Sequence, residues 1–348
     1  MRSQLQLPTF YLNLTLDKLE LFYNSEFNLK PALAILGKHD FDRREFGFQV
    51  VRDNTIKFIR NISFATPEAL MKFIQQKIPL SMYVGAIYSE GPDYRKNKSI
   101  QQLQWIKREL VFDLDLTEYD PVRPCDCRGK NKMCNICWEL INVSMVWIHE
   151  TLKEDFGVKK ISWFFSGRRG VHAWIQDPEF SILNNDQRAS IVDYLAFFKG
   201  DGNTAKFSLI AKDNPFYLER VVKLIYETYI REANVDQLLN LGFKKERAMY
   251  ILNQRDKYGI SREFLQKYVF SDFKGPNISS SERLPSKEAI RDAILLRWSP
   301  RIDTAVTIDL RRILRLPGSI HGETGRIVRS IEEDELDYFD PFSEESIY

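Results

Sequence analysis

Residues 110–117 read LVFDLDLT and place two acidic side chains, Asp113 and Asp115, inside an otherwise apolar run. The apolar residues predict a buried β-strand, and side chains two residues apart in a strand project from the same face. Neighbouring carboxylates repel one another and lose hydration on burial, so one should bind a proton unless a cation neutralises both. The pair therefore indicates either a strand end that reaches solvent or arginine, or a site for divalent metal ions.

The composition sets the class of protein in which this strand lies. The 348 residues are 44% hydrophobic and 13% aromatic, enough for a large core and a second domain. The 50 basic and 48 acidic side chains give a net charge of +2, so any site for a polyanion must be local. No apolar run reaches the roughly 20 residues that span a bilayer, and the opening lacks signal-peptide features. We expect a soluble intracellular protein, cytoplasmic in a prokaryote or nuclear in a eukaryote, with no membrane partner.

All four cysteines lie close together, at positions 125, 127, 134 and 137. The pattern C-x-C-x₆-C-x₂-C ends in CNIC, a knuckle that lets two thiolates bind one tetrahedral zinc ion. Disulfides are uncommon in large intracellular chains, and free thiols are usually buried singly. The spacing therefore favours a closed, structural zinc knuckle over residues 122–140, with four free cysteines in a loop as the alternative.

The segments around these motifs alternate between strand and helix patterns. Strands are predicted where apolar and polar residues alternate or form short apolar runs, at 46–51, 56–64, 80–88, 161–165 and 171–176. Helices are predicted at 67–77, after Thr66 as N-cap, at 137–154 and at 186–199. The mixture predicts an α/β (α+β) core.

From about residue 215 to residue 297 the chain carries a series of helical patterns and almost no strand signal. We expect a discontinuous core of residues 1–205 and 296–348, and a helical insertion over 206–295. The acidic segment 332–348 is expected to be a solvated, mobile end.

The stretch SGRRGVHAW begins at Ser166 and joins two predicted strands. It offers a hydroxyl group, two glycines, the guanidinium groups of Arg168 and Arg169, and the imidazole of His172. These groups bind phosphate, and glycine lets the backbone approach a ligand closely. A plain hairpin turn with solvated arginines is the alternative interpretation.

The last informative stretch, residues 301–325, reads RIDTAVTIDLRRILRLPGSIHGETG. Thr307 is expected to cap a short helix on which Arg311 and Arg315 share a face, one turn apart. The chain then turns back and presents His321. A solvated basic helix is the alternative for an isolated RRILR segment.

The letters DLDLT also match the phosphatase motif of the haloacid dehalogenase type. In that interpretation Asp113 is the nucleophile, Asp115 the acid/base and Thr117 lies behind them. The downstream acidic pair that this chemistry needs is missing, because KGDGNTAK at 199–206 lacks the second acid. A phosphatase therefore remains the weaker alternative.

Taken together, VFDLDLTEYD, the cysteine knuckle, SGRRGVHAW, RID and LPGSIHGETG resemble, in this order, the small catalytic subunit of archaeal and eukaryotic DNA primases. The resemblance covers residues 40–200 and 296–330, and LRLPGSIHG is closer to the archaeal form. It implies an archaeo-eukaryotic primase-type catalytic core with a mixed, largely antiparallel sheet, a zinc knuckle and a helical insertion.

The resemblance also implies the roles of single residues. Asp113, Asp115 and Asp303 match the catalytic carboxylates that bind two Mg²⁺ or Mn²⁺ ions. The residues that match nucleotide and phosphate contacts are Ser166, Arg168, Arg169, His172, Arg315 and His321, and the zinc ligands are Cys125, Cys127, Cys134 and Cys137. At Glu323 the related motif often carries lysine, so one phosphate contact is expected to be missing or replaced.

The implied function is template-directed synthesis of short RNA primers, with DNA as an alternative product, on single-stranded DNA from nucleoside triphosphates. The implied partner is a primase large subunit, which would carry the iron–sulfur cluster because zinc uses all four cysteines. A zinc-containing nucleic-acid-binding module that has lost the reaction is the alternative from a different class.

Overall fold

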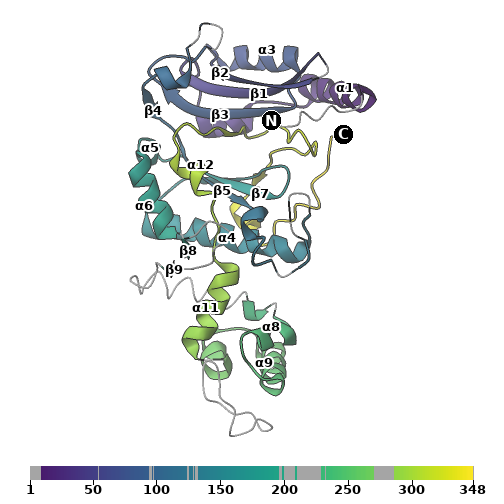
Figure 1. Ribbon diagram of the computed structural model, residues 1–348, viewed down its shortest axis with the longest axis vertical. Helices are drawn as coiled ribbons and strands as arrows, with labels where there is room; N and C mark the ends of the chain where they lie inside the picture. The colour runs from purple at the N-terminus through teal and green to yellow at the C-terminus, as the bar shows by residue number, and fades with distance from the viewer. Residues whose placement is uncertain are drawn as a thin grey trace.

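The computed structural model in Figure 1 arranges the chain in layers along its longest axis. Helices lie over one antiparallel sheet, a second sheet follows below it, and a long helix covers the far face of the second sheet. A group of helices lies beyond that, at the opposite end from the first sheet. The structure describes residues 9–53, 55–93, 96, 98–123, 125–127, 129, 132–195, 198–199, 208–209, 229–231, 233–269 and 286–347.

The first sheet is antiparallel, with the order β10-β3-β1-β2 and with β4 also paired to β3. Its strands are β1 (Arg44–Arg52), β2 (Thr55–Ile62), β3 (Ser81–Tyr88), β4 (Trp105–Lys107) and β10 (Leu314–Arg315). The helices of this layer are α1 (Thr9–Ser25), α2 (Lys30–Leu36) and α3 (Pro67–Lys77). As predicted, Thr66 caps α3: its side chain accepts a hydrogen bond from the Ala69 amide at 3.2 Å.

The second sheet is also antiparallel and has the order β11-β6-β7-β5. Its strands are β5 (Leu110–Asp115), β6 (Ile161–Phe165), β7 (Gly170–Ile175) and β11 (Ser330–Ile331). The two faces of β5 are buried in different cores. Leu110, Phe112 and Leu114 pack into the cluster around α4 (Asn135–Asp155), whereas Val111 joins the core of the first sheet. The odd-numbered side chains of β5 therefore face the first sheet.

The chain returns to the first sheet through α12 (Thr304–Ile308) and β10, and this segment differs from the prediction. Asp303, not Thr307, is the N-cap, because its Oδ1 accepts a hydrogen bond from the Ala305 amide at 3.1 Å. Thr307 is fully buried inside the helix. Arg315 does not share a helix face with Arg311, because the chain has already joined β3 as a strand.

The remaining helices lie beside and below the second sheet. They are α5 (Pro178–Ser181), α6 (Asn185–Leu195), α8 (Val235–Asn240), α9 (Lys245–Tyr258), α10 (Arg262–Phe264) with the π-turn Leu265–Val269, and α11 (Lys287–Trp298). The prediction of a helix to residue 199 was too long, because 198–199 pair with 208–209 as β8 and β9. Of the segment 215–297, for which helical patterns were predicted, residues 215–228, 232 and 270–285 lie outside the described residues.

The acidic C-terminal segment is packed against the core through residue 347, so the expectation of a solvated, mobile end was wrong. Leu336 and Phe339 are each 3% exposed, and the Phe339 carbonyl accepts a hydrogen bond from Trp138 Nε1 at 2.9 Å. Arg329 pairs with both Glu335 and Glu344. Burial of these two apolar side chains stabilises the packed position of the segment despite its many acidic residues.

Among the described helices, none combines the length and apolar character of a membrane span.

Candidate active site

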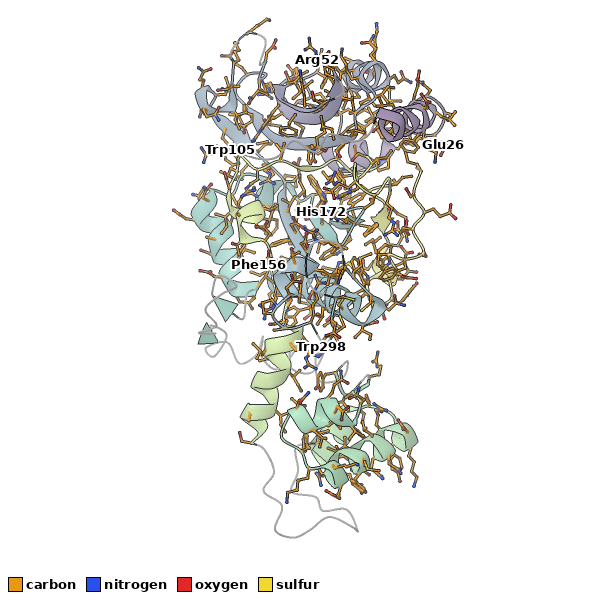
Figure 2. The ribbon with its side chains drawn as sticks, turned by 45° about the vertical axis from the view of Figure 1, so that its right-hand side comes forward. Glu26, Arg52, Trp105, Phe156, His172 and Trp298 are labelled. Carbon is orange, nitrogen blue, oxygen red and sulfur yellow. The ribbon has the colours of Figure 1, made fainter. Side chains whose placement is uncertain are left out.

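The site lies in the space between the two sheets, where β5 ends. Asp113 and Asp115 follow Val111 on the face of β5 that looks toward the first sheet. Asp303 reaches them from α12, and its amide donates a hydrogen bond to the Asp113 carbonyl at 2.9 Å. His172, opposite Asp113 in the β5–β7 register, lies near the middle of the molecule in Figure 2.

The three carboxylates form an electrostatically costly group. Burial, and after it the charges of Asp115 and Asp303, raises the pKa of Asp113 to about 8. Burial together with the Asp303 and Asp115 charges also raises the pKa of Glu118, one turn beyond the strand. Without a cation, Asp113 therefore holds a proton at neutral pH. Carboxylate oxygens are the ligands that Mg²⁺ and Mn²⁺ prefer, so the chemistry of this group fits divalent ions.

One oxygen of Asp115 is already held by the protein. Its Oδ1 accepts hydrogen bonds from the Thr117 amide and hydroxyl, both at 2.8 Å, and from Arg169 Nε at 2.6 Å. Three donors on one oxygen limit the rotation of this carboxylate. Thr117, which the phosphatase interpretation used, therefore orients Asp115.

Arg108 holds the other end of α12 and is a residue that sequence reasoning missed. It is 2% exposed, and its Nη1 donates hydrogen bonds to the carbonyls of Val306 at 2.9 Å and Asp309 at 3.0 Å. Arg188 in turn donates to the Arg108 carbonyl at 2.6 Å. Helix α12 is thus fixed at its start to β5, through Asp303, and at its end to Arg108, two residues before that strand. A lone arginine before an apolar run gives no sequence signal of this role.

The SGRRG turn between β6 and β7 packs against the loop that carries His321. Gly167 has φ +88°, and a Cβ built there would lie 2.6 Å from the His321 Cβ. Only glycine fits this turn. Arg168 Nη1 lies 2.5 Å from Glu323 Oε2, so the acid at this position binds a guanidinium group of the turn.

Both site histidines are held in the neutral form. Burial, and after it the charge of Arg315, lowers the pKa of His172 to about 3. Burial, with Arg315 and Arg168, lowers the pKa of His321 to about 3 as well. His172 Nε2 lies 3.7 Å from Asp113 Oδ1. The imidazoles therefore act as hydrogen-bonding groups, and the arginines supply the positive charge.

Arg315 enters the site from the first sheet. Its guanidinium group lies over the Tyr83 ring at 5.2 Å from the centroid, and its Nη1 donates to Ser81 Oγ at 3.1 Å. Ser81 also accepts a hydrogen bond from the Gly322 amide at 3.0 Å. Ser81 and Tyr83 are therefore further site residues, and neither was predicted, because they look like ordinary strand residues.

A single cavity of about 400 Å³ brings the predicted residues together. Its lining includes Asp113, Asp115, Asp303, Ser166, Arg168, Arg169, His172, Arg315 and His321. The lining combines carboxylates with arginines, a set of groups that can accept metal ions beside a polyphosphate. The first sheet adds Gln49, which the sequence did not signal.

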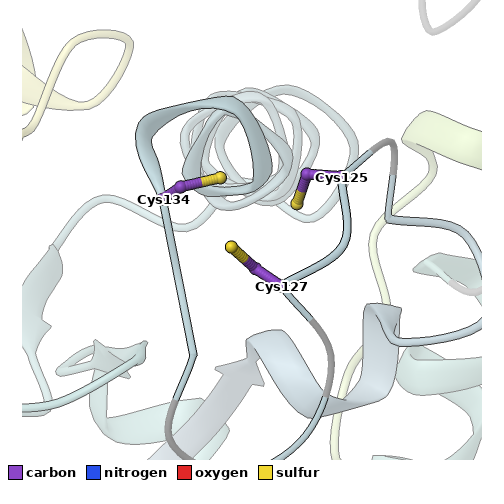
Figure 3. A group of neighbouring side chains, drawn as sticks. All are labelled: Cys125, Cys127 and Cys134. Carbon is purple, nitrogen blue, oxygen red and sulfur yellow. The ribbon is translucent and has the colours of Figure 1, made fainter.

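The cysteines form a second potential metal site. Figure 3 shows the sulfur atoms of Cys125, Cys127 and Cys134 pointing toward one another, and all three lie within 4.8 Å of each other. Cys137, on the first turn of α4, has its Sγ 3.8 Å from that of Cys134. Four sulfur atoms around zinc at about 2.3 Å are separated by about 3.8 Å, so this pair fits one edge of such a tetrahedron. The three-cysteine cluster can bind zinc.

Without a cation, the pKa values of two of the thiols are raised, whereas burial of Cys134 is outweighed by hydrogen bonds with the Cys137 backbone and the other thiols, which lower its pKa. The hydrogen bond with Cys134 and desolvation raise the pKa of Cys127 to about 11, and burial raises the pKa of Cys137 to about 12. Zinc ligation requires thiolates and releases these protons.

Arg123 holds the cysteine loop against the end of β5. Its guanidinium group donates hydrogen bonds to the carbonyls of Leu116 at 3.1 Å and Lys132 at 2.8 Å.

Comparisons with known proteins agree with this geometry. The family model described as DNA primase small subunit matches residues 112–333. A protein named DNA primase small subunit from Schizosaccharomyces pombe is 32% identical over 320 residues, which cover 87% of this chain and 69% of that protein. The protein named DNA primase small subunit PriS from Pyrococcus abyssi is 29% identical over 333 residues, 92% of this chain and 89% of the relative. The range matched by the family model spans the aspartates, the SGRRG turn and the cysteines. The resemblance drawn from the motifs is confirmed: this chain belongs to the DNA primase small subunit family.

Proposed function

We propose that this chain is the catalytic subunit of a DNA primase and synthesises short RNA primers on a single-stranded DNA template. The observation that carries the proposal is the meeting of three aspartates from β5 and α12 with the basic residues of the SGRRG turn and β10 in one cavity. Carboxylates that can bind metal ions, close to basic groups that can bind phosphate, are what nucleotidyl transfer requires.

Asp113, Asp115 and Asp303 would hold two divalent ions, Mg²⁺ or Mn²⁺. Bound there, the ions lower the pKa of a ribose 3′-hydroxyl group and neutralise charge on the phosphates. Thr117 and Arg169 keep Asp115 oriented, and the cap interaction of Asp303 keeps its carboxylate beside β5. Preorganised ligands cost no rearrangement when the substrate arrives.

The basic and polar residues of the cavity would bind the triphosphate. Arg168 and Arg315 provide charge-assisted donors for the β and γ phosphates, and Ser166, His172 and His321 provide hydrogen bonds. The 3′-oxygen of the primer then bonds to the α-phosphorus, the bond from that phosphorus to the bridging oxygen breaks, and pyrophosphate leaves. The hydroxyl proton passes to water. In-line attack needs no covalent enzyme intermediate, in contrast to a phosphatase that uses Asp113 as nucleophile.

Zinc in the cysteine knuckle would be structural, with Cys137 as the fourth ligand beside Cys125, Cys127 and Cys134. A site with four thiolates is closed and offers no position to a substrate. We also propose the division into a core of residues 1–205 and 296–348 and a helical insertion of residues 206–295. The partners would be a large subunit that carries an iron–sulfur cluster, the DNA template and nucleoside triphosphates, in an intracellular setting.

The test is primer synthesis on single-stranded DNA with labelled ribonucleoside triphosphates and Mg²⁺ or Mn²⁺. The wild type is compared with Asp113→Ala/Asp115→Ala and with Lys72→Ala, an exposed lysine on α3 as control. Metal-dependent oligomers from the wild type and the control, but not from the double variant, are expected. If no protein makes oligomers even with a large subunit added, the polymerase proposal fails and a non-catalytic nucleic-acid-binding module takes its place.

A further inference from the structure

A second cavity, of about 390 Å³, adjoins the one that holds the aspartates. The two cavities share Arg168, Arg169 and Glu323 in their linings. The far side of the second cavity is formed by Lys132 from the cysteine knuckle and Arg326 from the loop before β11. The Arg168–Glu323 ion pair thus lies where the two spaces meet.

The charges that line the second cavity favour an anion. Lys132, Arg168, Arg169 and Arg326 contribute positive charge, and Glu323 is the one acidic side chain in the lining that the structure describes. Within the described part of the chain, neither Lys132 nor Arg326 makes a salt bridge. Arg168 is 21% exposed at its side chain, and its partner Glu323 is 70% exposed, so a stronger anion could displace this carboxylate.

The walls of this cavity are held by hydrogen bonds. Thr324 Oγ1 donates to the Gly167 carbonyl at 2.6 Å, and Ser346 Oγ donates to the Thr324 carbonyl at 2.7 Å. Arg123 donates to the Lys132 carbonyl at 2.8 Å and so ties the knuckle to this side of the site. Lys132 is therefore presented by the same loop that carries the cysteines.

We propose that this second cavity binds the terminal diphosphate or triphosphate group of a ligand, separately from the nucleotide bound at the aspartates. Its natural ligand rests on the proposed polymerase function and has two sources with the same chemistry. One is the pyrophosphate that leaves after each addition, and the other is the 5′-triphosphate of the growing primer. Arg168 and Arg169 reach both cavities, so the ligand can pass from one to the other without losing all of its charge partners.

Glu323 lowers the affinity of the second cavity for phosphate groups, because it competes with them for Arg168. Its carboxylate occupies Arg168 when no ligand is bound, and a phosphate must displace it to gain the same guanidinium group. The acid therefore weakens anion binding and favours release. Replacement by glutamine removes the competing charge while it keeps the size of the side chain.

The experiment is isothermal titration of the full-length chain with pyrophosphate, without divalent ions. Lys132→Ala/Arg326→Ala is expected to bind pyrophosphate about tenfold more weakly, and Glu323→Gln several-fold more tightly. The control Lys72→Ala/Arg52→Ala removes the same charge from exposed positions of α3 and β1 and is expected to bind as the wild type does. Thermal unfolding of each variant checks that it is folded.

Two further titrations show which ligand the second cavity binds and whether this cavity is separate from the nucleotide site at the aspartates. A dinucleotide with a 5′-triphosphate is compared with the same dinucleotide with a 5′-hydroxyl, and ATP reports the site at the aspartates. If Lys132→Ala/Arg326→Ala weakens the binding of pyrophosphate alone, the natural ligand is the leaving group. If it weakens the binding of the triphosphorylated dinucleotide more than that of pyrophosphate, the natural ligand is the 5′ end of the primer. Equal loss of ATP and pyrophosphate binding, or no loss of either, overturns the proposal. No titration needs catalysis, so failure of primer synthesis would count against the proposed function alone.

Discussion

The aspartates and the cysteines are both clusters of anionic ligands, but the protein supports them in opposite ways. Asp113 and Asp115 lie on β5, the strand that pairs with β7 at one edge of the second sheet, and Asp303 is fixed to it by a backbone hydrogen bond. Of the cysteines, only Cys137 lies in a regular element, and the other three come from a half-buried loop. Hydrogen bonds between regular elements thus hold the acidic site, whereas we expect a bound zinc ion to stabilise the loop of the knuckle.

The sharpest test of this contrast compares one ligand from each cluster in the primer assay. Asp303→Asn should lower kcat by about 10²- to 10³-fold, because it removes one of the three carboxylates proposed to bind the catalytic metal ions, without moving the strand. Cys134→Ser should change kcat by less than about threefold at 25 °C, since the zinc site is proposed to be structural. Steady-state rates at saturating Mn²⁺ measure both. A comparable loss in the two variants would mean that the knuckle takes part in the chemistry.

A second test asks how far the fold itself positions the acidic site. Arg108→Met removes the donors to the Val306 and Asp309 carbonyls, and we expect kcat to fall by about 10- to 100-fold because Asp303 loses its fixed position. Titration with Mn²⁺ should also show a higher concentration at half-maximal activity.

The matched control is Lys107→Met, at the residue that precedes Arg108. The Lys107 ammonium group forms an ion pair with Asp40, with an N···O distance of 3.0 Å, and Lys107 does not line the cavity of the aspartates. Arg108→Lys should recover part of the lost activity, because an ammonium group can still donate to one carbonyl. If Arg108→Met keeps the Mn²⁺ dependence of the wild type and loses only stability, Arg108 has a structural role alone.

These contacts also show how much could be predicted from the sequence. The longer strands β1, β2, β3, β5, β6 and β7, the long helix after the cysteines and the N-cap at Thr66 follow from periodicity and capping chemistry, which are local. The short strands β4, β10 and β11 were not predicted, and β10 lies where a helix was expected. The SGRRG turn carried its own signal because glycines and basic residues stand together. Arg108, Ser81 and Tyr83 act through residues that are distant in sequence, so no local pattern marks them.

The errors have a common physical origin. Thr307 and Asp303 are both good N-cap residues four positions apart, and the choice depends on the Asp113 carbonyl that fixes Asp303. The acidic tail was judged by its charges, whereas Leu336 and Phe339 decide its position by burial. In each case a tertiary contact selected between two locally acceptable structures.

A third test removes the metal from the knuckle. Chelation, or Cys134→Ser, should lower the free energy of unfolding by about 2–4 kcal/mol, because bound zinc stabilises only the folded loop. Zinc content per chain and the thermal midpoint report the loss. Chelation of the Cys134→Ser variant should produce no further shift, and an additional shift there would show that the chelator acts elsewhere.

The smallest change in the free energy of unfolding is expected for a substitution at the acidic site. That substitution should stabilise the protein, whereas loss of zinc from the knuckle should destabilise it. Because the pKa of Asp113 is raised to about 8 in the folded chain, its ionisation opposes folding once the pH exceeds about 4, the ordinary value of an aspartate. Asp113→Asn should therefore stabilise the metal-free protein by an amount that is near zero below pH 4, grows up to pH 8 and is constant above it. The side chain is about a fifth exposed, so we expect on the order of 1–3 kcal/mol at pH 8.

The measurement is the free energy of unfolding in chelated buffer between pH 4 and pH 9, compared with Asp53→Asn, an exposed acid on the β1–β2 turn. Addition of Mn²⁺ should stabilise the wild type and remove most of the advantage of Asp113→Asn, since the ion neutralises the charge that burial penalises. A pH-independent difference between the two proteins would mean that Asp113 is ionised in the folded chain at all of these pH values. The acidic site would then resemble the knuckle in depending on a bound cation, and the contrast between the two clusters would be lost.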